Sequence, residues 1–344
     1  MSRDRPLDGA RLLLTDATMF PFGPRQLREI TEAGATLVEV AGHEPEEVAR
    51  AGKRCQAMFA YYVRVDHALL SRMPDLQVVA RCGVGYDRID IEAARARGIS
   101  VTYVPGYGSA DVAEHAIALL LACARRLGAI DRAVQEGGWP TYPELGPMRR
   151  VAGSTLGLVG FGRIARQVAR RARGLDMAVI AFDTEMDAGV AADLGVEPVG
   201  FELLLERSDF VSIHVPLLPT THHLLDATAI SRMRPGAVLV NTSRGPIVDQ
   251  EALVAALESG RIASAGLDVL EREPPTAADR VLGRANLLIS PHSAAYSEES
   301  FEELMTTALR DALAVLRGQP PRHLVPELAG DGEGPHRAAR EEQA

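Results

Sequence analysis

Short apolar runs alternate with helix-like segments over the first hundred residues. The apolar runs are RLLLTD, TLVEV, AMFAYYV, LQVVARCG and ISVTYVP, and the segments between them are QLREITEAG, PEEVARAG, HALLSRMP and IEAARARG. Strands separated by helical patterns of this length are typical of βαβ units. The pattern therefore predicts a parallel sheet with helices packed against it.

The rest of the chain repeats this alternation after one long helical stretch. Residues 111–137 form a mostly apolar helical pattern that ends at Gly-Gly-Trp-Pro, and we interpret it as a bridge between domains. A second alternating series, from STLGLVG to NLLIS, predicts a second doubly wound parallel sheet. Apolar positions from Phe301 to Leu316 recur at helical spacing and predict an amphipathic helix that packs back on the body. Residues 329–344 lack apolar periodicity and are predicted to be disordered.

Length and charge narrow the class of protein. A chain of 344 residues is longer than one usual domain, so we expect two domains that share a cleft. The net charge of −9 gives no general attraction to nucleic acid or to an anionic membrane surface. The apolar run at 116–124 has about half the length that a membrane crossing needs. The three cysteines form no CxxC pair and follow no secretory signal, which favours a reducing cytoplasm.

A glycine-rich turn in TLGLVGFGRIARQVARRA indicates a dinucleotide site. Gly160 and Gly162 belong to a GxGxx[G/A] pattern that follows a strand-like run and opens a helical one. Such a turn lets backbone N–H groups and a helix N-terminus approach a pyrophosphate. Asp183 ends the next strand-like run, where a carboxylate can accept hydrogen bonds from a ribose diol and repel a 2′-phosphate. The pattern favours NAD over NADP. The alternative is a glycine-rich turn that binds nothing.

Three kinds of side chain are candidates for chemistry on a carbonyl group. Arg244, in NTSRGPIVD, follows a strand-like run and could bind a carboxylate, although it could equally be a surface or ion-pairing arginine. Glu273 lies just beyond another strand in GLDVLEREPP, where Glu271 competes with it. His292, in SPHSAAYSEES, follows a rigid proline and precedes small residues that leave room for a cofactor and a substrate. A carboxylate partner could keep its imidazole protonated for donation.

His214 is the serious rival to His292, because it too ends a strand-like run. The remaining histidines that we weighed are interpreted as packing or surface residues: His115, His222, His223, His323 and His336. The chain has no HExxH motif and no Cys/His cluster with ligand spacing, so no metal site is predicted. It also lacks a GxSxG elbow and a GxxxxGK[ST] loop, which leaves redox chemistry.

Taken together, the motifs closely resemble the D-isomer-specific 2-hydroxyacid dehydrogenase family. The resemblance covers roughly residues 10–318 and rests on VARCGVGYDRIDIEAARARGI, VPGYGSADVAEHAIALLLA, GLVGFGRIA, SIHVPL, LVNTSRGPIVDQEALVAALESGRI, AGLDVLEREPP and SPHSAAYSEES. It implies an α/β fold of two Rossmann-like domains. The substrate-binding domain would comprise residues 1–105 and 298–328, and the NAD-binding domain residues 106–297.

The resemblance also implies which residues act. The family's catalytic arginine, glutamate and histidine correspond to Arg244, Glu273 and His292. Formate dehydrogenases of the same fold carry glutamine at the position of Glu273, so the glutamate distinguishes this chain from them. Arg244 and the backbone of the Gly83, Val84 and Gly85 loop would bind the carboxylate of a small 2-oxo acid. The implied NAD contacts are Gly160, Gly162, Arg163, Ile164, Asp183, Val215, Pro216, Thr242, Ser243, Asp268, Ser293 and Ala294.

The resemblance predicts an NAD-dependent D-2-hydroxyacid dehydrogenase that is a homodimer, with contacts through the helical stretch from Asp111 and the GGWP segment. The cysteine pattern adds the expectation of a cytoplasmic location. PHSAAYSEES and YGSADVAEHA look most like the branch that contains the C-terminal-binding-protein co-repressors, but Ala295 stands where the co-repressors carry tryptophan. Two alternatives stay open. One is an NAD(H)-sensing binding protein like the co-repressors, and the other is an oxidoreductase of a phosphonate-type oxyanion, because the same arginine and backbone loop accept any small anion.

Overall fold

The structure is a computed structural model that describes residues 7–146 and 148–329. The described residues divide into two compact units, which we treat separately. Unit 1 comprises residues 7–107 and 298–329, and unit 2 comprises residues 108–146 and 148–297. Most of the tail that the sequence predicts to be disordered, residues 330–344, lies outside the described residues. Within the described ranges, no helix combines the length and the apolar character that a membrane crossing requires.

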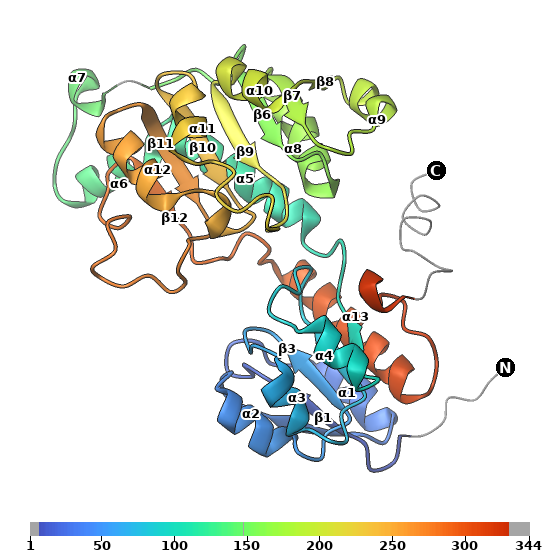
Figure 1. Cartoon of the computed structure of the whole chain (residues 1–344). Helices are drawn as coiled ribbons and strands as arrows, with labels where there is room; N and C mark the ends of the chain where they lie inside the picture. The colour runs from blue at the N-terminus through green and yellow to red at the C-terminus, as the bar shows by residue number, and fades with distance from the viewer. Residues whose placement is uncertain (1–6, 147, 330–344) are drawn as a thin grey trace. The chain divides into compact units, whose positions relative to one another are not determined.

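Unit 1 is built on a five-stranded parallel sheet with the order β2-β1-β3-β4-β5. Its strands are β1 (Arg11–Leu14), β2 (Thr36–Glu39), β3 (Ala57–Ala60), β4 (Val78–Arg81) and β5 (Ser100–Thr102). Figure 1 labels its strands β1 and β3. The central strand β3 is buried at every position, as the uninterrupted apolar run AMFA predicts for a sheet covered on both faces. The chain reverses its direction across the sheet between β1 and β3, which makes their carboxyl ends the topological switch point.

Helices cover both faces of the sheet in unit 1. They are α1 (Pro24–Glu32), α2 (Pro45–Gly52), α3 (His67–Ser71), α4 (Ile91–Ala96) and α13 (Glu298–Leu316), with a short 3-10 turn η2 (Pro326–Leu328). Helices α2, α3 and α4 pack on one face, and α1 and α13 pack on the other. Helix α13 thus brings the last part of the chain against the first, as the apolar spacing of residues 301–316 predicts.

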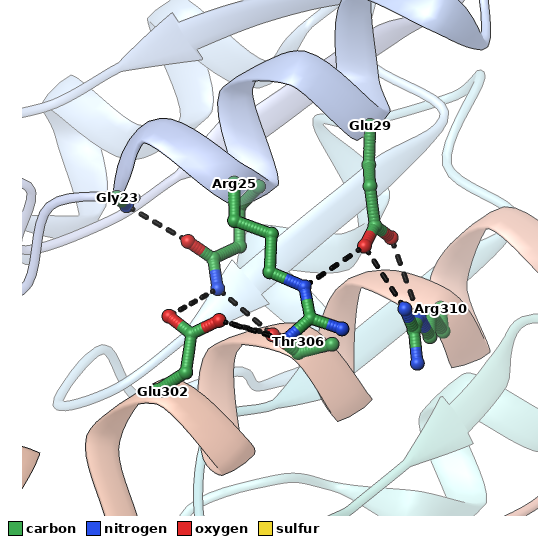
Figure 2. A network of polar contacts seen from close by, with 7 residues as sticks. Gly23, Arg25, Glu29, Glu302, Thr306 and Arg310 are labelled. Carbon is green, nitrogen blue, oxygen red and sulfur yellow. Dashed lines mark hydrogen bonds and ion pairs between the residues drawn. The ribbon is translucent and has the colours of Figure 1, made fainter. Parts of the chain in front are cut away.

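A polar network holds α13 against α1 (Figure 2). The amide of Gln26 is 1% exposed, and its nitrogen donates to Glu302 Oε2 at 3.0 Å and to Thr306 Oγ1 at 2.9 Å. Around it, Arg25 contacts Glu302 and Arg310 contacts Glu29 at the solvent-facing rim. The buried amide is therefore satisfied by its partners on α13, while the exposed ion pairs add little stability.

Unit 2 is built on a seven-stranded parallel sheet with the order β12-β11-β10-β9-β6-β7-β8. Its strands are β6 (Thr155–Val159), β7 (Ala178–Phe182), β8 (Glu197–Pro198), β9 (Phe210–Ile213), β10 (Ala237–Asn241), β11 (Ile262–Leu267) and β12 (Leu287–Ile289). The switch point of this sheet lies between β6 and β9, the order expected of a dinucleotide-binding sheet. The two parallel sheets confirm the predicted fold class.

The helices of unit 2 are α5 (Ser109–Ala124), α6 (Leu127–Gln135), α7 (Tyr142–Leu145), α8 (Arg163–Gly174), α9 (Ala188–Asp193), α10 (Phe201–Arg207), α11 (Ala227–Arg232) and α12 (Gln250–Glu258), with the 3-10 turn η1 (Gly245–Ile247). Helices α5, α8 and α9 pack on one face of the sheet, and α10, α11 and α12 on the other.

The single helical stretch expected over residues 111–137 is two helices. Arg126 adopts a left-handed φ of 54° and separates α5 from α6. The break has a packing reason, because a Cβ at Gly128 would lie 2.4 Å from a methyl carbon of Leu288, so the chain comes close to β12 immediately after the break. Apolar periodicity continues through such a change of direction, so the sequence pattern did not reveal it.

Candidate active site

The glycine turn after β6 lies at the switch point of the unit 2 sheet. Gly160 has a φ of 95°, a conformation that side chains rarely adopt. A Cβ there would lie 2.7 Å from the carbonyl oxygen of His214 and 2.9 Å from Val215 Cγ1, both just beyond β9. Glycine is therefore required at position 160 because the ends of β6 and β9 meet there.

The N-terminus of α8 opens directly after this turn. Gly162 precedes the helix without a side-chain cap, and a Cβ at Gly162 would meet no atom within 4 Å. The first N–H groups of a helix, here those of Arg163 and Ile164, have no partner within the helix. Open space beside unsatisfied donors and the positive end of a helix fits a pyrophosphate.

Asp183 holds the same turn in place. The carboxylate follows β7, and its Oδ2 accepts the N–H of Phe161 at 2.6 Å while its Oδ1 accepts the N–H of Glu185 at 2.8 Å. Each carboxylate oxygen has two lone pairs, so each retains one for a further donor. The residue thus fixes the glycine turn and keeps capacity for the hydroxyls of a ribose.

The loop after β10 carries Thr242, Ser243 and Arg244. Asn241, which our sequence reasoning missed, holds both ends of this loop: its Oδ1 accepts the N–H of Ser243 at 2.9 Å and its Nδ2 donates to the carbonyl of Arg244 at 2.9 Å. Ser243 Oγ donates to the carbonyl of Ile213 at the end of β9. The Thr242 hydroxyl oxygen is buried without a hydrogen-bond partner in the described structure. Such an orphaned group is costly, and a bound cofactor could supply its partner.

Arg244 is brought close to the loop that follows β11. A Cβ at Gly245 would lie 1.9 Å from the carbonyl carbon of Leu270, so only glycine permits this approach. The Arg244 guanidinium donates to the carbonyl of Ser243 at 2.8 Å. Its positive charge also acts on the carboxylate of Glu273, as the pKa of that group shows.

Glu273 and His292 are in direct contact. His292 Nδ1 lies 2.8 Å from Glu273 Oε2, and the side chains are 39% and 29% exposed. Partial burial raises the pKa of Glu273, but the hydrogen bond and charge of His292, the N–H of Leu270 and the charge of Arg244 outweigh it and lower the pKa overall. A carboxylate that keeps its charge can orient the imidazole and stabilise its protonated form, with Nε2 left to face a substrate.

Asp268 organises the loop that carries His292. The carboxylate is 2% exposed and accepts the N–H groups of Ser293 and Ala294, each at 2.9 Å, and the hydroxyl of Ser290 at 2.5 Å. Its own carbonyl accepts the N–H of His292 at 2.8 Å. His292 has a left-handed φ of 54°, which is uncommon for a residue with a side chain. Asp268 therefore fixes the loop conformation that orients His292.

His214 and Glu271, the alternatives to His292 and Glu273, lie in different surroundings. Burial lowers the pKa of His214 to about 4, and its Nε2 lies 2.8 Å from Ser212 Oγ. An imidazole that is neutral at pH 7 lacks the acidic imidazolium proton that a general acid donates. Glu271 instead contacts His223 Nε2 at 2.8 Å and accepts the N–H of Gln250. These contacts favour His292 over His214 and Glu273 over Glu271, the two choices that the sequence left open.

The predicted carboxylate-binding loop, Gly83 to Gly85, follows β4 in unit 1. The N–H of Gly83 donates to the carbonyl of Arg81 at 3.0 Å, and a Cβ there would lie 2.8 Å from the Arg81 guanidinium. Among residues 7–146 and 148–329, no partner is found for the N–H groups of Val84 and Gly85. The donors available to an anion are thus those of Val84 and Gly85, while Gly83 shapes the loop.

The candidate groups share a position in their sheets. Arg244, Glu273 and His292 follow β10, β11 and β12 at the carboxyl edge of the unit 2 sheet, and Gly83 to Gly85 occupy the same edge of the unit 1 sheet. Val215 and Pro216 follow β9 on that edge of unit 2. Ligands of open α/β sheets bind at this edge, so the predicted residues lie where the fold places chemistry.

Comparisons with known proteins agree on one family. A family model described as "D-isomer specific 2-hydroxyacid dehydrogenase, NAD binding domain" matches residues 117–294. The glyoxylate reductase of Korarchaeum cryptofilum is 40% identical over 311 residues, which are 87% of this chain and 94% of that protein.

Solved structures give the same result. The TT0316 protein of Thermus thermophilus superimposes with a TM-score of 0.85 at 35% identity, over 92% of this chain and 99% of that one. The D-lactate dehydrogenase of Aquifex aeolicus, complexed with NAD and lactic acid, gives a TM-score of 0.81 at 28% identity, over 91% and 98% of the chains.

Proposed function

This chain belongs to the D-isomer specific 2-hydroxyacid dehydrogenase family, and we propose that Arg244, Glu273 and His292 carry its reaction. The chain is an NAD-dependent oxidoreductase of small 2-hydroxy and 2-oxo acids, as the family match and the relatives indicate. The single observation that supports the catalytic assignment is the contact between His292 Nδ1 and Glu273 Oε2 at 2.8 Å.

The proton step follows from that contact. Because Glu273 occupies Nδ1, Nε2 is the ring nitrogen from which His292 donates a proton to the carbonyl oxygen of a 2-oxo acid. In the reverse direction Nε2 takes the proton of the hydroxyl group. The negative charge of Glu273 stabilises the imidazolium. Asp268 holds the loop that carries His292 through the N–H groups of Ser293 and Ala294.

Two groups would hold the substrate anion. The Arg244 guanidinium suits a carboxylate and also polarises the carbonyl group that is reduced. The N–H groups of Val84 and Gly85 are the donors that unit 1 offers to a carboxylate. We therefore assign cofactor binding and Arg244 to unit 2, and assign to unit 1 the backbone loop that binds substrate.

NAD fits the residues at the switch point of unit 2. Gly160, Gly162, Arg163 and Ile164 would hold the pyrophosphate and Asp183 the ribose, because they combine open space, free donors and an acceptor. Val215 and Pro216 would flank the adenosine. We place the nicotinamide end beside Thr242, Ser243, Asp268, Ser293 and Ala294. When bound, the reduced cofactor supplies the hydride for the carbonyl carbon.

A substrate screen tests the proposed function. We expect the protein to oxidise NADH in the presence of other short 2-oxo acids and of glyoxylate, the substrate in the name of its archaeal relative. NADPH should be a poorer cofactor, because Asp183 would repel its 2′-phosphate. Reduction of a prochiral 2-oxo acid should give the D isomer, which chromatography on a chiral column measures. NADH binding without turnover on any 2-oxo acid would contradict the proposal and support an NAD(H)-sensing role.

We further propose that the protein is a cytoplasmic homodimer. A reducing compartment suits its cysteines, because Cys55, Cys82 and Cys123 are all buried and unpaired. Burial raises the pKa of Cys82 and of Cys123 to about 12, so these thiols stay protonated. We place the dimer contact at α6 and Trp139.

A further inference from the structure

Helix α5 carries a histidine whose side chain reaches the end of β12. The side chain of His115 is 27% exposed, and its Nε2 lies 2.8 Å from the hydroxyl oxygen of Ser290, the residue that directly follows β12. The two residues are 175 positions apart, and both belong to unit 2. The contact lies just before His292 in the chain, and the proposed reaction assigns no role to His115.

The hydrogen bonds of this contact run in one direction. The ionised carboxylate of Asp268 can only accept, and Ser290 Oγ lies 2.5 Å from its Oδ1, so the single hydroxyl hydrogen of Ser290 is directed to Asp268. Ser290 Oγ must then accept from His115, whose Nε2 carries the hydrogen. The same nitrogen lies 3.6 Å from Asp268 Oδ1. His115 and Ser290 therefore form a chain of donors that ends on a buried carboxylate.

Ser290 and Asp268 both contact the backbone of His292. The N–H of His292 donates to the carbonyl of Ser290 at 3.0 Å and to the carbonyl of Asp268 at 2.8 Å. His292 also has a left-handed φ of 54°, which a residue with a side chain keeps only where its surroundings hold it. The direction in which the imidazole points thus depends on the positions of Ser290 and Asp268.

A second contact joins α5 to the same loop. Gly108 precedes the helix with a φ of 61°, and a Cβ there would lie 3.1 Å from Ala295 Cβ. This approach follows His292 in the chain, whereas the contact with Ser290 precedes it. Helix α5 is itself fixed, because residues such as Leu120 are buried in the core of the unit 2 sheet. The helix is therefore a rigid support for both ends of the loop that carries His292.

We propose that His115 is a positioning residue of the reaction: its hydrogen bond to Ser290 holds the Asp268 carboxylate, and these two residues hold the orientation of His292. Without that donor, the Ser290 hydroxyl loses a partner and can rotate away from Asp268. The loop then samples conformations in which the imidazole does not face the substrate, and a misplaced catalytic group lowers the rate even when binding is unchanged. This inference rests on the proposed function, because it concerns the proton donor named there.

Removal of the donor should lower turnover and leave ligand binding nearly unchanged. For His115→Ala with NADH and glyoxylate we expect kcat to fall about tenfold, while the KM of glyoxylate and the Kd of NADH stay within about threefold. His115→Gln offers an amide N–H near the position of Nε2 and should recover most of kcat. Glu114→Ala removes the preceding side chain of α5, which is 65% exposed and paired with Arg171, and should change none of these quantities.

A double-mutant cycle shows whether His115 acts through Ser290. Ser290→Ala breaks the same chain of hydrogen bonds and should also lower kcat. The double variant should then be no slower than the slower single variant, because both substitutions remove one interaction. Losses that multiply would show that His115 affects turnover by another route and would overturn the proposal. A purely structural role would lower the melting temperature of His115→Ala and leave kcat of the folded protein unchanged.

The outcomes separate this inference from the function on which it rests. An active wild type whose kcat is unchanged in His115→Ala would overturn the role of His115 alone, and so would a His115→Gln variant as slow as His115→Ala. If His115→Ala does not fold, the inference requires a lower kcat in Ser290→Ala and a nearly wild-type kcat in His115→Gln. A wild-type protein that reduces no 2-oxo acid would overturn the proposed function and this inference together.

Discussion

At the residue scale, a histidine–carboxylate contact does not by itself identify a catalytic group. His292, His43, His223 and His323 each lie within 2.9 Å of a carboxylate oxygen. The carboxylate that contacts His292, Glu273, also has a pKa lowered by the charge of Arg244 on a neighbouring strand end. The surroundings of the pair therefore decide its role, and they come from three separate loops.

The buried imidazole of His214 should make the stability of the fold depend on pH. Its folded-state pKa is about 4, below the ordinary value of 6.5, so the unfolded chain binds the proton first as the pH falls. Stability is then complete above pH ~6.5 and declines towards pH ~4, by about 2 kcal/mol between pH 7 and pH 5.

Urea denaturation of the wild type and of His214→Gln at pH 7 and pH 5 measures this effect. The variant should lose less stability than the wild type over the same interval, by about the amount given above. Parallel losses in the two proteins would show that His214 does not titrate in this range.

The sequence predicted some of the site residues but not the contacts between them. His292 and Glu273 are 19 positions apart, and their contact arises from two loops whose conformations no local pattern specifies. Asn241 was missed because an asparagine at a strand end has no distinctive signal, although it bonds both ends of the Arg244 loop.

At the element scale, hydrophobic periodicity predicted the type and order of the main strands and helices. It succeeded because strands buried on both faces, such as β3 and β10, form continuous apolar runs. It failed where the chain turns without a change of composition, as at Arg126 between α5 and α6. The short elements α7, α9 and β8 were also missed, since two to six residues are too few to show a period.

Helix α6 is the element that we expect to form the dimer contact. None of its residues is buried within one chain, and Leu127, Val134 and the following Trp139 are 54%, 39% and 85% exposed. Apolar side chains gathered on one segment are typical of a subunit interface. Light scattering should therefore give a mass of twice 36.9 kDa.

A matched pair of variants tests the position of this contact. Trp139→Ala should shift the protein towards monomer at low concentration, because truncating an aromatic anchor weakens an interface by about 2 kcal/mol or more. Leu203→Ala, on α10, removes a side chain that is 44% exposed and should leave the mass unchanged. A monomeric wild type, or equal effects of the two substitutions, would refute an interface at α6.

At the scale of the whole molecule, the chain repeats one architectural rule in two units. Each unit is a doubly wound parallel sheet, and in each the candidate residues follow strands at the carboxyl edge. Strand alternation in the sequence predicts such sheets but not the order of their strands. That order, which depends on long-range pairing, places Gly160 beside His214 and Asp16 beside Tyr62. The assignment of one unit to NAD and the other to the substrate stays a proposal.

The most direct test of the central claim compares the wild type with His292→Asn. Asparagine keeps a donor for Glu273 but removes the nitrogen that donates the proton. With NADH and glyoxylate we predict that kcat falls by about 10²- to 10⁴-fold while the Kd of NADH, measured by fluorescence, stays within about twofold. His223→Asn, which alters the other histidine–glutamate pair of unit 2, should leave both quantities unchanged. An unchanged kcat in His292→Asn would contradict the account.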